Sequence, residues 1–200
     1  MERPIVEKKI STLLKKYPKS SVLFVDDFLD YGNSESVKKA LLRLKEKEIL
    51  VRLAHGIYLY PKVDKELGVL FPSTEDIARA IARRDKARIV LTGVQALNKL
   101  GLSTQVPMKV VYLTDGAARS IKVGKRTITF KKTSPKNLLA KGEISSLVIQ
   151  ALKTIGQSKV DNAILLKIHK LLKKEKSENI INDAKLAPAW INKLLMQTIR

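Results

Sequence analysis

The spacing of hydrophobic positions changes several times within the first 62 residues, and each change indicates a new element. Apolar residues three or four positions apart indicate helices, whereas short runs rich in β-branched and aromatic residues indicate strands. Pro18 and Gly32 end helical segments, and Asn33 or Ser34 offers an N-cap for a third helix. The pattern predicts a helix over 4–17, a strand over 22–24, a brief helix over 26–31, a helix over 34–47, and strands over 49–53 and 57–60.

This order of elements is typical of a winged helix-turn-helix. The third helix carries Val37, Ala40, Leu41 and Leu44 on one side, which we expect to face the core. The turn at 54–56 joins two strands into a ribbon directly after that helix. Residues 1–62 are therefore predicted to form a winged helix-turn-helix domain that binds DNA.

Residues 63–157 have a mixed pattern, predicted to be an α+β domain. Ser73 or Thr74 caps a helix there, and Gly124 separates two strand-like segments in a hairpin. The other predicted elements are strands over 88–91 and 109–114, and helices over 93–100 and 144–155.

Residues 158–200 are predicted to form a helical C-terminal extension. The segment 161–174 has an apolar and a lysine-rich side, and Trp190, Leu194 and Leu195 would dock the end of the chain on the second domain. The fold class expected for the chain is therefore α+β: a winged helix-turn-helix, a second mixed α/β domain and a helical extension.

Charge adds a functional expectation to this picture. The chain has 39 Lys+Arg against 19 Asp+Glu, a formal net charge of +20, and the excess is spread over all three parts. Such a chain attracts polyanions, because neutralising phosphates releases condensed counterions. Charge alone does not separate DNA from RNA or from an acidic protein, and many lysine-rich microbial proteins bind nothing acidic.

Enzyme chemistry finds no support in the sequence. There is no Cys, and the only two His are far apart, so no thiolate or His/Cys metal site is expected. Patterns typical of P-loops, dinucleotide sites, zinc proteases and serine hydrolases are absent. No signal peptide or membrane span is expected either. We predict a cytoplasmic protein that is not an enzyme and needs no metal or cofactor.

The candidate DNA-binding residues lie on the third helix and the ribbon. In a winged helix the N-terminal part of the third helix meets base edges in the major groove. Arg43 is the candidate for a bidentate contact to guanine, whereas Tyr58 and Tyr60 are interpreted as cross-strand packing. The alternative is an ordinary solvated helix face. The residues assigned to DNA binding are Asn33, Ser34, Ser36, Lys38, Lys39, Arg43, Arg52 and His55.

A second cationic surface is predicted on the hairpin at 119–132, which contains no acidic residue. This basic ribbon could extend the DNA footprint or face an acidic partner, or it could be a charged edge strand that prevents aggregation. Its members are Arg119, Lys122, Lys125, Arg126, Lys131 and Lys132.

Several segments resemble AbiEi-type antitoxins, over about residues 1–155. The winged-helix part is similar in KKALLRL (38–44) and VRLAHGIY (51–58), and the second domain in LTGVQALNKLGL (91–102) and VYLTDG (111–116). The resemblance implies a protein that represses its own operon by binding inverted repeats in double-stranded DNA. It also implies that the second domain neutralises a nucleotidyltransferase toxin, by direct binding or without contact. The helical tail after Lys159 departs from that pattern.

Two other functions stay open. One is an RNA-binding or ribosome-associated basic protein, although few aromatic residues (5%) argue against base stacking. The other is a plain winged-helix regulator without a toxin, which differs only in its neighbouring gene. No heptad pattern is present, so the sequence leaves a monomer or a weak dimer.

Overall fold

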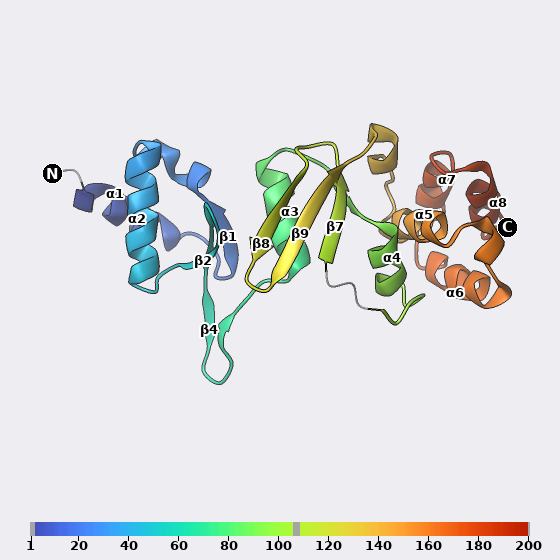
Figure 1. Ribbon diagram of the computed structural model, residues 1–200, viewed down its shortest axis with the longest axis horizontal. Helices are drawn as coiled ribbons and strands as arrows, with labels where there is room; N and C mark the ends of the chain where they lie inside the picture. Colours follow the sequence, from blue (N-terminus) through green and yellow to red (C-terminus); the bar gives the residue numbers. More distant parts are fainter. Residues whose placement is uncertain (1–2, 106–108, 200) are drawn as a thin grey trace. The chain divides into compact units, whose positions relative to one another are not determined.

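The computed structural model describes residues 3–105 and 109–199. Contacts divide the chain into two compact units, Met1–Ala80 with Lys122–Lys125, and Ile81–Ile121 with Arg126–Arg200 (Figure 1). Helices and three small sheets are mixed along the chain, and the C-terminal part is helical. The predicted α+β class is therefore confirmed, while the division into three domains stays a prediction.

The first unit follows the predicted order of a winged helix-turn-helix. Its strands β1, β3 and β2 form an antiparallel sheet in that spatial order, with Leu23 opposite Tyr58 and Val51 opposite Leu59. The elements are α1 (Arg3–Leu14), β1 (Ser21–Phe24), the 3₁₀ helix η1 (Val25–Tyr31), α2 (Ser34–Glu46), β2 (Val51–Ala54) and β3 (Ile57–Tyr60). The brief helix predicted before Gly32 is thus present, as a 3₁₀ helix.

The core of this unit holds α2 in place. Phe28 of η1 is fully buried together with Val37, Leu41 and Leu44 of α2. Asn33 is the N-cap of α2, and its side chain accepts a hydrogen bond from the Ser36 N–H at 2.9 Å. The predicted apolar stripe of this helix is therefore confirmed.

A second hairpin follows the winged helix, where the sequence pattern predicted no element. It is formed by β4 (Lys62–Asp64) and β5 (Gly68–Leu70), which pair antiparallel. The Asp64 carboxylate accepts hydrogen bonds from the Glu66 N–H at 2.9 Å and the Leu67 N–H at 3.0 Å. An Asx turn therefore closes the hairpin. The chain then enters α3 (Thr74–Arg84), which crosses the boundary between the units.

The second unit contains a four-stranded sheet and a group of helices. The strand order is β6-β7-β9-β8, with β6 antiparallel and β9 parallel to β7. The elements after α3 are β6 (Ile89–Leu91), α4 (Gly93–Lys99), β7 (Lys109–Thr114), β8 (Arg119–Val123), β9 (Arg126–Lys132), the 3₁₀ helices η2 (Pro135–Leu138) and η3 (Gln157–Lys159), and α5 (Glu143–Ile155), α6 (Asn162–Leu172), α7 (Ser177–Ala184) and α8 (Ala189–Gln197).

The motif VYLTDG ends β7 in a local hydrogen-bonded turn. Thr114 donates a hydrogen bond through Oγ1 to the Arg88 carbonyl at 2.8 Å and accepts one from the Gly116 N–H at 3.0 Å. Asp115 accepts hydrogen bonds from both the backbone N–H and the side-chain Nε of Arg88, each at 2.8 Å. These bonds, the backbone one first, hold the pKa of Asp115 below its usual value. The motif therefore has a structural role in joining β6 to β7.

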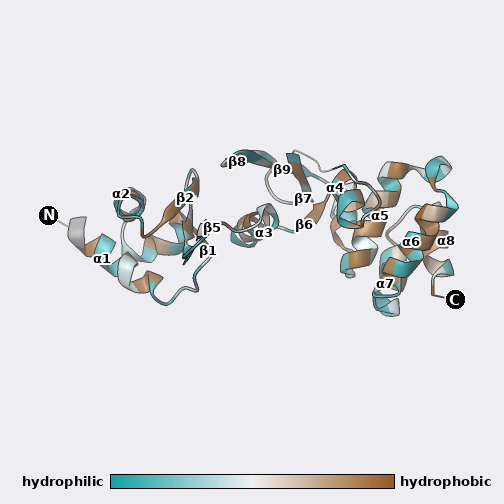
Figure 2. Ribbon diagram, turned by 90° about the horizontal axis from the view of Figure 1, so that it is seen from below, coloured by the Kyte–Doolittle hydropathy of each residue, from teal (hydrophilic) through white to brown (hydrophobic). Residues whose placement is uncertain are grey.

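The C-terminal helices share one apolar core. Residues of α5 such as Leu152 pack with Leu172 of α6, Ile180 of α7 and Leu195 of α8, and each of these helices carries hydrophobic and hydrophilic stretches (Figure 2). Trp190 is packed against the same cluster, as expected from the sequence. The N-terminal end of α5 is closed by carboxylates from much later in the chain, which sequence patterns did not indicate.

Candidate nucleic-acid interface

The solvent side of α2 presents most of the residues assigned to DNA. Asn33, Ser34, Lys38 and Lys39 are exposed, and Ser36 is half-buried beneath the N-cap bond. Lys39 forms an ion pair with Glu35 one turn earlier, and both side chains are largely exposed. Such surface pairs contribute little to stability, so Lys39 can exchange Glu35 for another anion at small cost.

Arg43 is placed differently from the two lysines. Its side chain is 34% exposed, and its Nη1 lies 3.8 Å from the Glu7 carboxylate of α1. Lys47 pairs with the same Glu7, which is itself 15% exposed. Glu7 therefore ties the C-terminal half of α2 to α1. The sequence analysis missed Glu7, because no local pattern links residues forty positions apart.

The ribbon after α2 places its two candidates at the surface. Arg52 and His55 are exposed, and Gly56 adopts φ 70° in the turn that follows His55. The register of β2 against β3 shifts between Arg52 and Ala54, which bends the strand just before the turn. Tyr58 is buried, which confirms its interpretation as packing.

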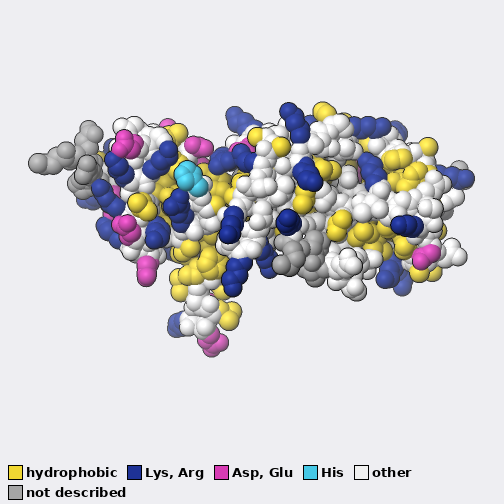
Figure 3. Space-filling view, viewed as in Figure 1, with side chains coloured by type: hydrophobic (Ala, Val, Ile, Leu, Met, Phe, Trp, Pro, Cys, Tyr) yellow, Lys and Arg dark blue, Asp and Glu magenta, His cyan; other side chains and the backbone are white. Residues whose placement is uncertain are grey.

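The predicted basic ribbon is five exposed residues and one packed one. Lys122, Lys125, Arg126, Lys131 and Lys132 are exposed. Arg119 is half-buried: it pairs with Asp85, and its guanidinium lies 5.8 Å from the centre of the Phe130 ring. The structure therefore places Arg119 apart from the other members of the ribbon. Lys and Arg side chains are spread widely over the face shown in Figure 3.

Other kinds of site were searched for within the described residues, 3–105 and 109–199. No group of three or more His, Cys, Asp or Glu side chains there is arranged to hold a metal ion. None of the helices described is long and apolar enough to cross a bilayer.

Comparisons with known proteins place the chain in a family. In structure it is similar to the RV2827C protein from Mycobacterium tuberculosis, with a TM-score of 0.45 and 13% sequence identity over 97% of this chain and 81% of that one. No curated protein matches the chain in sequence. The model of a family of unknown function, DUF6088, matches residues 9–180, and the chain belongs to that family.

Proposed function

We propose that the first unit binds double-stranded DNA, with α2 in the major groove and the β2–β3 turn against the backbone. The observation that carries this proposal is the two-sided burial of α2. Val37, Leu41 and Leu44 are fully buried, while Lys38 and Lys39 on the opposite side are exposed. A helix held in this way projects one polar side from a rigid body, as groove-reading helices do.

The charges on α2 suggest a division of labour between its two halves. Asn33, Ser34, Lys38 and Lys39 lie in its N-terminal half, which is the part that meets base edges and phosphates in winged helices. Arg43 is near Glu7, so base contact would require it to give up that neighbour. We therefore assign the leading contacts to the lysines, and to Arg43 the positioning of α2 on α1.

The finer proposal follows the resemblance to AbiEi-type antitoxins. The protein would repress its own operon by binding inverted repeats and would neutralise a nucleotidyltransferase toxin. A nucleotidyltransferase site that holds divalent metal is acidic, and the five exposed basic residues of the 119–132 ribbon are of the sign needed to oppose it. The identity of the neighbouring gene separates this function from that of a regulator without a toxin.

The test of DNA binding is a salt titration with the double variant K38A/K39A. Each lysine on a phosphate contributes about 0.9 to the slope of log affinity against log salt, so the pair should lower the slope by about two and affinity by roughly 60-fold at ~0.1 M salt. Duplexes carrying the region upstream of the protein's own gene and a scrambled sequence are both titrated by mobility shift.

The matched control is K170A, which removes an exposed lysine of α6 in the second unit. It should leave affinity and slope close to those of the unaltered protein. Equal behaviour of K38A/K39A and K170A would overturn the assignment of α2. So would tighter binding of a double-stranded RNA hairpin than of either DNA duplex.

A further inference from the structure

The β4–β5 hairpin exposes large apolar side chains to solvent. Val63 is 67%, Leu67 78% and Phe71 64% exposed, and Leu67 follows Glu66 at the tip (Figure 3). Backbone hydrogen bonds from Leu67 and Glu66 hold the pKa of Asp64 below its usual value, so this carboxylate is ionised at neutral pH. The hairpin therefore presents an apolar tip flanked by two carboxylates. Contiguous exposed apolar side chains of this kind mark interaction sites.

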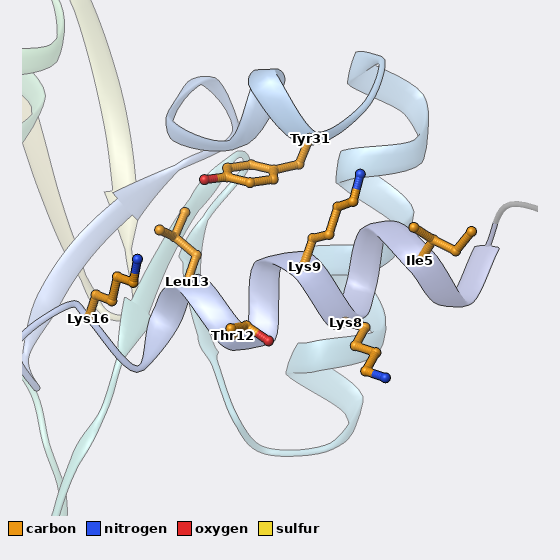
Figure 4. Close-up of a pocket in the computed structure, with 7 residues that line it drawn as sticks. All are labelled: Ile5, Lys8, Lys9, Thr12, Leu13, Lys16 and Tyr31. Carbon is orange, nitrogen blue, oxygen red and sulfur yellow. The ribbon is translucent and has the colours of Figure 1, made fainter.

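The outer side of α1 has a pocket of complementary character. Its volume is about 520 Å³, and Tyr31 of η1 lies across α1 with the Lys9 side chain beside it (Figure 4). The lining comprises Ile5, Leu13 and Tyr31 as an apolar floor and Lys8, Lys9 and Lys16 as a cationic rim. These three lysines are exposed and, within the described part of the chain, have no carboxylate partner.

We infer that the β4–β5 hairpin of one copy of this protein docks in the α1 pocket of a second copy. Leu67 would enter the apolar floor, and the carboxylates of Asp64 and Glu66 would face the lysine rim. The hairpin contributes no residue to the pocket of its own chain. Both features belong to the first unit, so the pairing needs only that unit.

Electrostatics favours this hairpin as the contact between copies. Two chains of charge +20 repel each other, so association requires a place where acidic groups of one copy meet lysines of the other. The hairpin segment 62–68 is locally neutral, with two acidic and two basic side chains, and it places the acidic ones beside the apolar tip.

A symmetric exchange gives two identical contacts. In a two-fold dimer, each hairpin fills the pocket of its partner, so every substitution acts twice. The inference does not depend on DNA binding, because association is measured on the protein alone. A dimer that failed to bind DNA would leave it intact, and a DNA-binding monomer would refute it.

The experiment is sedimentation velocity of the full chain from about 1 to 200 µM, a range that brackets micromolar association. Dimer should form at low salt and dissociate as salt rises, because the carboxylate–lysine contacts are exposed to screening. L67S, at a position 78% exposed and so without effect on folding, should weaken association by at least about 10-fold, since both contacts lose their apolar anchor.

A charge exchange separates this contact from a general effect of charge. K9E and E66K should each weaken association, and the double variant K9E/E66K should restore much of it, whereas the surface control K170E should act like none of them. A monomer throughout the concentration range would overturn the inference. So would dimerisation that L67S leaves unchanged, or a double variant no better than K9E alone.

Discussion

Replacement of Asp183 by alanine is the perturbation whose cost the structure defines best. This carboxylate of α7 is fully buried. Oδ1 accepts hydrogen bonds from the Lys141 N–H at 2.8 Å and the Asn182 amide at 3.0 Å, and Oδ2 accepts one from the Gly142 N–H at 2.9 Å. Ser145, also fully buried, donates its hydroxyl proton to the same oxygen. Asp183 thus acts as the cap of α5 although it lies about forty residues later in the chain.

The magnitude follows from the donors left behind. D183A leaves the Gly142 N–H and the Ser145 hydroxyl without an acceptor in the interior, and it weakens the solvation of the Lys141 N–H. Each buried donor that loses its partner costs about 1–3 kcal/mol, so the expected loss in free energy of unfolding is about 3–6 kcal/mol. The conservative D183N keeps one acceptor oxygen and should lose roughly half as much.

The assay is urea unfolding followed by tryptophan fluorescence. Trp190 is the only tryptophan of the chain, and it packs against the cluster formed by α5–α8. The signal therefore reports on this cluster and not on the first unit. With a slope of about 2 kcal/mol per M, the midpoint for D183A should fall by roughly 1.5–3 M.

The matched control is E178A, which removes an exposed acid from the first turn of the same helix. Loss of its interaction with the helix dipole should cost about 0.3–1 kcal/mol. A midpoint for D183A equal to that of E178A would refute the reasoning, because the buried hydrogen bonds would then contribute nothing net.

Two further predictions concern the close packing of α4 and the basic ribbon. At Gly93 a Cβ atom would overlap the Thr154 hydroxyl and the Gln150 carbonyl oxygen of α5, so G93A should destabilise the second unit by about 3 kcal/mol in the same urea assay, whereas V94A should change it little. The ribbon variant with Lys122, Lys125 and Arg126 changed to Glu should keep its fold but lose rescue of cells that express the neighbouring nucleotidyltransferase gene. Unimpaired rescue would exclude the ribbon as the neutralising surface.

Local elements were predictable wherever a short-range signal specified them. The apolar stripe of α2, the Asn33 cap and the Gly124 turn all lie within one element or its ends, and the structure has each of them as predicted. The β4–β5 hairpin was missed because its strands have three residues each and an Asx turn in place of a glycine-led one. Strands this short carry too few alternating positions to stand out.

The candidate site was predictable in composition more than in geometry. Exposure of Lys38 and Lys39 follows directly from the helical period that buries Val37 and Leu41. Arg43 has an equally polar place in that pattern, yet Glu7 draws it toward α1. In the same way Asp85 removes Arg119 from the exposed ribbon.

The sequence by itself determined the winged-helix order, the side of α2 that faces solvent and the strongly basic character of the chain, because helical periodicity, caps and net charge are local or additive properties. Only the tertiary structure decided which charges are engaged. The pairs of Glu7 with Arg43 and Asp85 with Arg119, and the capping of α5 by Asp183, join positions 34 to 42 residues apart. Packing brings such positions together, and the low dielectric of the interior makes their pairing matter, so no pattern of neighbouring residues records them.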